Sequence, residues 1–158
     1  MININIICVG KLKEKFFKDA VSEYSKRLSR FANLTITEIP DEKIPDNASE
    51  SICRQILEKE GAKILSAAKD APIIAMCVEG QLVKSEDIAE KLEDASMHGG
   101  KLCFVIGGSL GLWDEVKKQA IFKMSFGRIT LPHQLMRVVL LEQIFRGFKI
   151  SANETYHK

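Results

Sequence analysis

Residues 72–80 read PIIAMCVEG, and residues 101–113 read KLCFVIGGSLGLW. Each segment contains a short, almost wholly apolar run, and each run ends just before a glycine. Strands that are apolar on both faces are typical of parallel sheets covered by helices on either side. The two runs therefore predict central strands of an α/β fold. The glycines after them mark a place where backbone can approach a ligand, because glycine has no Cβ.

The segments around these runs alternate between strand and helix patterns. Period-two or wholly apolar runs indicate strands, and apolar residues at every third or fourth position indicate amphipathic helices. Ser85 is expected to cap one helix, and Pro132 suits the first turn of the last. Strands are predicted at 3–9, 34–39 and 122–129, and helices near 17–31, 49–69, 85–97, 112–120 and 132–150. This order predicts one α/β domain over residues 1–158 with a mainly parallel sheet.

Composition narrows the class of protein. No run approaches the ~18 uninterrupted apolar residues of a membrane span. The first lysines follow a short apolar run, which reverses the order of a signal peptide, so we expect a cytoplasmic protein. The four cysteines form no CxxC pair and no zinc-like spacing with histidine, so buried reduced thiols and no metal are expected. The net charge of +2 is unevenly spread, with bases near both ends and acids between them. That spread fits a polyanion-binding face or ordinary solvated helix faces.

The glycine-rich turn does not match the common phosphate motifs. GGSLG at 107–111 lacks the G-x-G-x-x-G spacing, and the chain has no G-x-x-x-x-G-K-[ST]. A dinucleotide site is therefore poorly supported, and a simple tight turn remains an alternative. Ligands of open α/β sheets gather beyond the carboxyl ends of the strands. The segments MCVEGQ, IGGSLG and FGRITLPH all follow predicted strands and are the candidates for such a site.

The final helix is apolar on more than one face. Arg137 shares a face with Leu141 and Ile144, while Val139 and Leu140 point elsewhere. A helix that is apolar nearly all round is buried. A second copy of the chain is the natural cover, since two-fold dimers are the commonest assemblies.

Several segments together carry a resemblance to a known family. They are VGKLKEKFFKDAVSEYSKRL, PDEK, FVIGGSLGL, TLPHQLMRVVLLEQIFRGFKI and the terminal TYHK. Across essentially the whole chain the sequence closely resembles the RlmH (YbeA-like) family, bacterial 23S ribosomal RNA pseudouridine methyltransferases of the SPOUT superfamily. The C-terminal pattern is the specific part of the likeness.

The resemblance implies a SPOUT-type α/β fold whose C-terminal part forms a deep trefoil knot. It also implies a homodimer, S-adenosyl-L-methionine as the cofactor, and methylation of N3 of pseudouridine 1915. That nucleotide belongs to helix 69 of 23S rRNA, and the substrate is the assembled ribosome. Three alternatives remain: another SPOUT RNA methyltransferase, a non-catalytic ribosome-binding protein, and a Rossmann-like nucleotide-binding enzyme.

The resemblance also assigns residues. Three loops are expected to hold the cofactor, the third largely through backbone groups; Gly127 and Arg128 stand where relatives often carry serine and a variable residue. We expect Arg137 to stabilise the developing base anion, with His133, Tyr156 and His157 helping in proton removal or nucleotide placement. Lys11, Lys13 and Lys15 are expected to meet phosphates. The expected cofactor residues are Met76, Gly107, Phe126, Gly127, Arg128, Ile129, Thr130 and Leu131.

Overall fold

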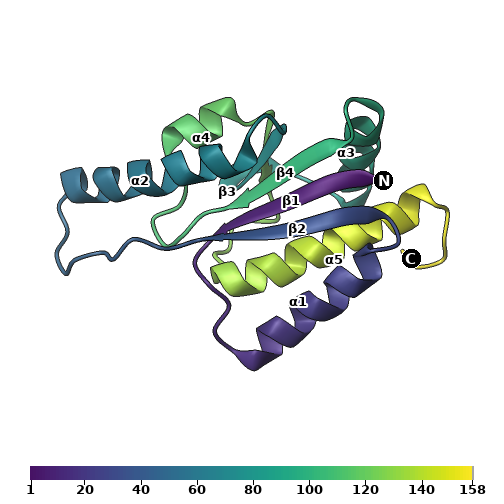
Figure 1. Ribbon diagram of the computed structural model, residues 1–158, viewed down its shortest axis with the longest axis horizontal. Coiled ribbons are helices and arrows are strands. Elements are labelled where there is room, and N and C mark those ends of the chain that lie inside the picture. The colour runs from purple at the N-terminus through teal and green to yellow at the C-terminus, as the bar shows by residue number, and fades with distance from the viewer. Residues whose placement is uncertain (158) are drawn as a thin grey trace.

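The computed structural model describes residues 1–157, in which strands and helices alternate as expected (Figure 1). The sheet order is β2-β1-β4-β3-β5, and every pairing is parallel. The predicted α/β fold with a parallel sheet is therefore confirmed. The strands are β1 (Ile2–Val9), β2 (Ala32–Ile39), β3 (Ile73–Leu82), β4 (Lys101–Ile106) and β5 (Phe122–Ser125), and the helices are α1 (Lys15–Leu28), α2 (Glu50–Ala68), α3 (Ser85–Met97), α4 (Asp114–Gln119) and α5 (His133–Ser151).

Helices cover both faces of the sheet and explain why the central strands are apolar throughout. Along β4, Leu102 and Phe104 pack with α1, α3 and α5 on one face. The alternate residues Cys103 and Val105 pack with α2 and α4 on the other face. Successive side chains of a strand point to opposite sides, so a strand buried on both faces shows no polar alternation.

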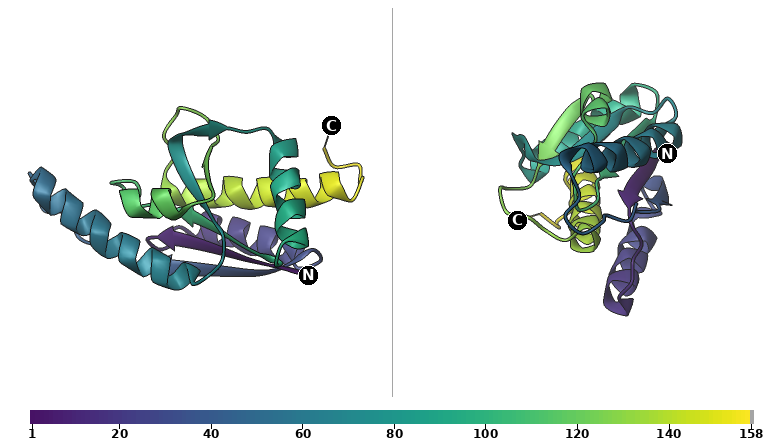
Figure 2. Two further views of the ribbon diagram at one scale, coloured as in Figure 1. Left: turned by 90° about the horizontal axis from the view of Figure 1, so that it is seen from above. Right: turned by 90° about the vertical axis from the view of Figure 1, so that its left-hand side faces the viewer.

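Helix α5 runs along one face of the sheet between α1 and α3 (Figure 2). Gly147 permits its close approach to α3, because a Cβ there would lie 2.9 Å from Leu92 Cδ1 and 3.3 Å from the backbone nitrogen of Ala89. Leu140, Leu141 and Ile144 are completely buried within the single chain. Much of the apolar surface predicted for this helix is thus covered by its own sheet and neighbouring helices.

Strand β3 is irregular at the point where it passes β5. Met76 and Gln81 both pair with Met124, so the register shifts and residues 77–80 bulge out of the ladder. Gly80 lies against the partner strand, where a Cβ would come within 2.8 Å of the Lys123 backbone. The bulge turns the carboxyl end of β3 into a wall of the pocket described below.

Several boundaries differ from expectation. Helix α1 ends at Leu28 rather than near residue 31, and β2 begins at Ala32 rather than at residue 34. Strand β5 ends at Ser125 rather than near residue 129, because Gly127 has a φ of 144° and turns the chain away from the sheet. Ser85 is not the cap of α3: the Lys84 N–H donates to Asp87 Oδ2 at 2.7 Å, while the Ser85 hydroxyl donates to Gln143 of α5 at 2.7 Å. Helix α4 begins at Asp114 rather than at Leu112.

Within residues 1–157, no helix combines the length and hydropathy needed to cross a bilayer.

Candidate functional site

A large pocket opens where β3, β4 and β5 end. Its volume is about 720 Å³, within the ~300–1,000 Å³ of ordinary small-molecule sites. Three segments form its walls, namely the β3 bulge, the glycine turn after β4, and the stretch between β5 and α5. The carboxyl edge of a parallel sheet is where α/β folds bind ligands.

The glycine turn after β4 folds back on itself. A Cβ on Gly107 would lie 2.5 Å from the carbonyl oxygen of Gly111, and Gly108 forms an isolated bridge with Gly111. Trp113 fixes the far end of the turn by packing on Gly61 of α2, where a Cβ would lie 2.5 Å from the indole. A side chain at position 107 would collide with Gly111, so only glycine fits there. The backbone of the turn is therefore accessible to a ligand.

Hydrogen bonds join the wall between β5 and α5 to the wall formed by the β3 bulge. The Ser125 hydroxyl contacts the carbonyl oxygens of Val78 and Gly127, each at 2.9 Å. The Arg128 guanidinium donates to the carbonyls of Val78 and Gly80, the latter at 3.0 Å. Gly127, with its positive φ, makes this tight return possible. The Arg128 side chain thus holds the bulge in place and does not line the pocket.

The structure brings most of the expected cofactor residues together. Met76 and Gly107 line the pocket, as do Phe126, Gly127 and residues 129–131. Met124, Leu112 and Val139 add further apolar surface. Apolar side chains with accessible backbone at a glycine turn suit an adenosine-containing ligand, because backbone groups can read a base edge while the side chains pack on its ring. The residues present therefore fit S-adenosylmethionine.

His133 begins α5 and lines this pocket. Its ring packs on Gly10, where a Cβ would lie 2.9 Å from Cε1. Within residues 1–157 its Nδ1 is buried without a hydrogen-bond partner. Burial, followed by the charge of Arg137, lowers the pKa of His133 below its ordinary value. The neutral imidazole, which can accept a proton, is therefore favoured at neutral pH.

Arg137 lies one turn further along α5 and is 1% exposed. Its guanidinium donates to Glu38 Oε2 at 2.8 Å and to the Gly10 carbonyl at 3.3 Å, and it does not line the pocket. Glu38 also accepts the Leu12 N–H at 3.0 Å. Burial would raise the pKa of Glu38, but these hydrogen bonds and the charge of Arg137 outweigh it, so the pKa is lowered. The pair joins the start of α5 to the ends of β1 and β2.

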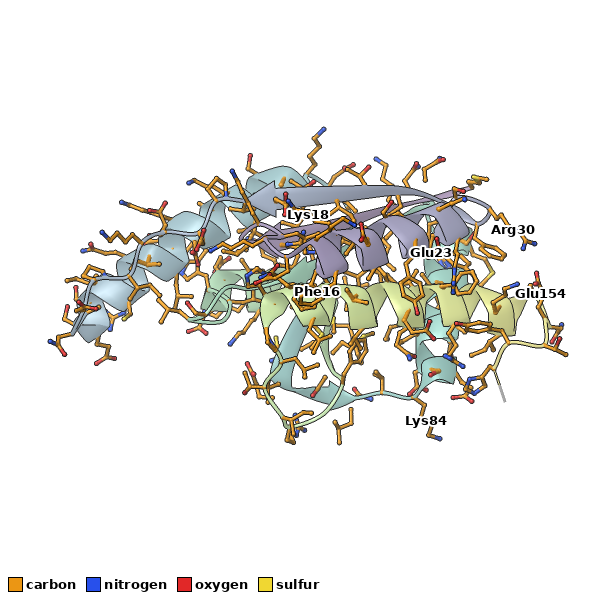
Figure 3. All side chains as sticks on the ribbon, turned by 90° about the horizontal axis from the view of Figure 1, so that it is seen from below. Phe16, Lys18, Glu23, Arg30, Lys84 and Glu154 are labelled. Atoms are coloured by element: carbon orange, nitrogen blue, oxygen red, sulfur yellow. The ribbon has the colours of Figure 1, made fainter. Side chains whose placement is uncertain are left out.

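Tyr156 and His157 lie at the other end of α5. The Tyr156 hydroxyl donates to Glu142 at 3.0 Å, and His157 lies 2.9 Å from Glu86 of α3. Arg146 also donates to Glu142, at 2.7 Å, and so belongs to the same cluster as Tyr156. Arg146 follows His133 by 13 residues, which separates the two by about 20 Å along the axis of α5. Figure 2 shows the C-terminal tail beyond the far end of α5. In Figure 3, Glu154 of this tail lies beside Arg30, whereas Phe16 lies toward the opposite end of α5, where that helix begins. One chain does not bring these two residues to the pocket.

Three of the free cysteines, Cys8, Cys77 and Cys103, are buried, and Cys77 lines the large pocket. Burial raises the pKa of Cys8 and of Cys103 to about 12, so neither is a thiolate at neutral pH. Among residues 1–157 no group of three or more histidine, cysteine, aspartate or glutamate side chains is arranged to hold a metal ion.

Sequence reasoning missed one buried group beside this site. Glu60 is 5% exposed on α2 and lines a second, smaller pocket. A signal was present, because Glu60 lies four residues after Ile56 and four before Ile64, on the apolar stripe of the predicted helix. A carboxylate on such a stripe is rarely buried without a partner.

Comparison with known proteins gives the family of this chain. The family model described as "Predicted SPOUT methyltransferase" matches residues 2–157. Proteins named "Ribosomal RNA large subunit methyltransferase H" from Bifidobacterium animalis subsp. lactis and Clostridium novyi are 51% and 54% identical, over 99% of this chain and 100% of each relative. A probable methylase family protein from Haemophilus influenzae has a similar fold, with a TM-score of 0.60 at 14% identity, covering 98% of this chain and 70% of that one. Since the family model spans nearly every residue and full-length relatives share half their positions, the chain belongs to the SPOUT methyltransferase family.

Proposed function

We propose that the protein uses S-adenosyl-L-methionine to methylate N3 of pseudouridine 1915 in helix 69 of 23S rRNA, on assembled ribosomes in the cytoplasm. The observation that carries this proposal is the large pocket, whose three walls contain the residues that the RlmH-family resemblance assigns to the cofactor. Full-length relatives named as large-subunit ribosomal RNA methyltransferases support the substrate class.

S-adenosylmethionine supplies a methyl group on a positively charged sulfur, so the reaction needs no metal ion. Met76 and Gly107 would hold the cofactor together with residues 126–131, largely through backbone groups in the last segment. We propose that these walls form the deep trefoil knot of the SPOUT fold. A fixed donor pocket places the methyl group and the acceptor nitrogen in one geometry, and such positioning can supply much of the rate.

His133 is the residue best placed to act on the acceptor base. N3 of pseudouridine must lose its proton before it can accept a methyl group. A half-buried imidazole with a lowered pKa in the pocket lining can take that proton. Arg137 is engaged by Glu38 and Gly10, so its contribution to the base anion acts through the positions of His133 and Gly10. In this role Arg137 is a positioning residue.

A homodimer would reconcile the two groups of residues assigned to the nucleotide. Within one chain, Tyr156 and His157 are separated from His133 by most of α5. A two-fold axis across α5 would bring the tail of one protomer toward the pocket of the other. The exposed Lys11, Lys13 and Lys15 lie just before or at the start of α1, and the Lys13 N–H donates to Gln134 beside His133 at 2.8 Å. We expect these lysines to meet RNA phosphates near the pocket.

The direct test is methyl transfer from labelled S-adenosylmethionine to intact ribosomes and to naked 23S rRNA, with mass spectrometry of the modified nucleotide. N3-methylpseudouridine at one site, formed on ribosomes, is the expected product. Methylation of transfer RNA instead would favour another SPOUT activity, and no product on any RNA would leave a binding protein. Activity should also fall steeply with added salt if phosphates are contacted.

A thermal-shift panel separates the cofactor classes. A ligand at 100 times its Kd adds about 2.7 kcal/mol of stability. S-adenosylmethionine should therefore raise the melting temperature clearly, and NAD and ATP should not. A shift with NAD alone would favour the Rossmann-like alternative.

A further inference from the structure

A second pocket of about 180 Å³ lies directly beside the large one. The two share a wall made of Gly108, Ser109 and His133. On its other sides the small pocket is closed by the end of β1, the loop after β2 and helix α2, including Val9 and Glu60. Its volume is below the ~300–1,000 Å³ of drug-sized sites, which suits a single ring rather than a nucleoside.

Glu60 gives this pocket a buried hydrogen-bond acceptor. Its Oε2 accepts the Glu42 N–H at 3.0 Å, and no other hydrogen bond to the carboxylate is present within residues 1–157. The second oxygen, Oε1, lies 3.7 Å from the place where a Cβ on Gly108 would stand, at the shared wall. Burial raises the pKa of Glu60 against the opposing effect of the Glu42 N–H. Oε1 has no donor among residues 1–157 and is not sealed from the pocket, so it is open to an N–H group of a ligand.

The imidazole of His133 belongs to the shared wall. Its Nδ1 is sealed within residues 1–157, which leaves Nε2 as the ring nitrogen open to a ligand. A ligand that spans the wall would have its middle beside the imidazole. One side of the ligand would face the Glu60 carboxylate, and the other side would face the large pocket. Three functional groups in a row on one edge of a ring would match this arrangement.

Pseudouridine has such an edge. Its sugar is attached at C5, so both ring nitrogens, N1 and N3, carry hydrogen and flank the C2 carbonyl. Uridine has its sugar on N1 and a C–H at the position that N1 takes in pseudouridine. A pseudouridine base entering with its C2 edge first would leave the sugar outside, because C5 lies opposite C2.

We propose that the small pocket receives this edge of the flipped target base, with Glu60 accepting the N1–H, the C2 carbonyl at the shared wall, and N3 beside His133 and directed toward the large pocket. Glu60 is thereby the residue that distinguishes pseudouridine from uridine. This inference rests on the proposed function and adds the specificity determinant to it. Flipping the base into a pocket that reads its edge is a general solution for enzymes that modify bases.

The test compares two ribosome preparations, one with pseudouridine and one with uridine at the target position. Methyl transfer is measured for the wild type, for Glu60→Gln, and for Glu58→Gln as a matched control on the exposed side of α2. In the glutamine variant the amide oxygen keeps the Glu42 N–H and turns the NH₂ group toward N1–H. We expect the wild type to prefer pseudouridine by 100-fold or more, since sites built to pair a substrate N–H reject analogues lacking it by up to ~10⁴–10⁵.

Glu60→Gln should reduce that preference at least tenfold, with S-adenosylmethionine affinity within twofold of wild type, whereas Glu58→Gln should keep the full preference. Binding of the cofactor-free protein to the two preparations should show the same pattern. If Glu60→Gln lowers both rates equally, the residue has only a structural role and the inference is wrong. Should that variant fail to fold, Glu60→Asp, which withdraws the carboxylate by one methylene, takes its place with the same criterion. A wild type that methylates neither preparation would instead refute the proposed function itself.

Discussion

The pair formed by Arg137 and Glu38 allows a quantitative test of how the start of α5 is held. Removing one partner of a buried ion pair typically costs ~3–5 kcal/mol, because the remaining charge is left uncompensated. The Arg137 side chain is 1% exposed, but that of Glu38 is 36% exposed. Water can reach the carboxylate, and the Gly10 carbonyl still bonds the guanidinium. We therefore expect Glu38→Gln to cost about 2 kcal/mol, roughly half the fully buried value.

The assay is urea unfolding at pH 7, followed by far-ultraviolet circular dichroism and by the fluorescence of the single tryptophan, Trp113. With an m value of ~1–3 kcal/mol/M, a 2 kcal/mol loss moves the midpoint by about 1 M. The protein concentration must be equal for all variants, because the proposed homodimer would contribute to the apparent stability. The variants are Glu38→Gln, Arg137→Met and the double substitution.

The double variant separates pairing from independent effects. If the residues act as a pair, its free energy of unfolding should exceed by about 1–2 kcal/mol the value expected from adding the two single losses. Methyl transfer should follow the same pattern, with partial recovery in the double variant. Simple additivity, or a Glu38→Gln midpoint equal to that of the wild type, would refute the structural role. Loss of activity on Arg137→Met with full activity in Glu38→Gln would support direct contact with the base.

Three further predictions concern the pocket. Gly107→Ala should weaken S-adenosylmethionine binding at least tenfold in calorimetry, since its Cβ would lie 2.5 Å from the Gly111 carbonyl oxygen; unchanged affinity would show that the turn yields freely. Arg128→Ala should raise the cofactor Kd severalfold by freeing the β3 bulge, whereas Arg128→Lys should restore part of the loss. The lowered pKa of His133 means that the unfolded chain binds more protons than the folded chain between the two values. The contribution of neutral His133 to stability is present above about pH 6.5 and is lost as the pH falls toward the pKa of His133 in the folded chain. The decline in the free energy of unfolding from pH 7.5 to 5.5 should therefore be smaller in His133→Gln than in the wild type.

Local patterns predicted much of the fold because the relevant forces act over a few residues. The apolar runs at 72–80 and 101–106 become β3 and β4. The helix expected from about residue 49 is α2, and the Ser49 hydroxyl caps it by accepting the Ile52 N–H. Predictions failed where a distant element takes over a local group. Ser85 looked like a helix cap, yet Gln143, 58 residues away, engages its hydroxyl. No local pattern reveals that competition.

The same distinction between local and long-range interactions applies to the candidate site. The residues themselves and their family likeness indicated which segments surround the cofactor, and the structure brings those segments to one pocket. The roles of individual side chains were less accessible. Arg137 was expected at the base but pairs with Glu38, 99 positions earlier, and Glu60 appeared only as an acid on an apolar stripe. Pairing and burial depend on the packing of separate elements, which spacing along one helix does not report.

By itself, the sequence determined the fold class and the position of the glycine turn, because strand apolarity and glycine's freedom are properties of short segments. Only the tertiary structure decided that Arg128 holds the bulge of β3, that Arg137 is sealed between α5 and β2, and that Tyr156 lies at the far end of α5 from His133. Each of these depends on which distant groups meet. The parallel sheet decides that by placing the ends of β1, β3, β4 and β5 on one edge.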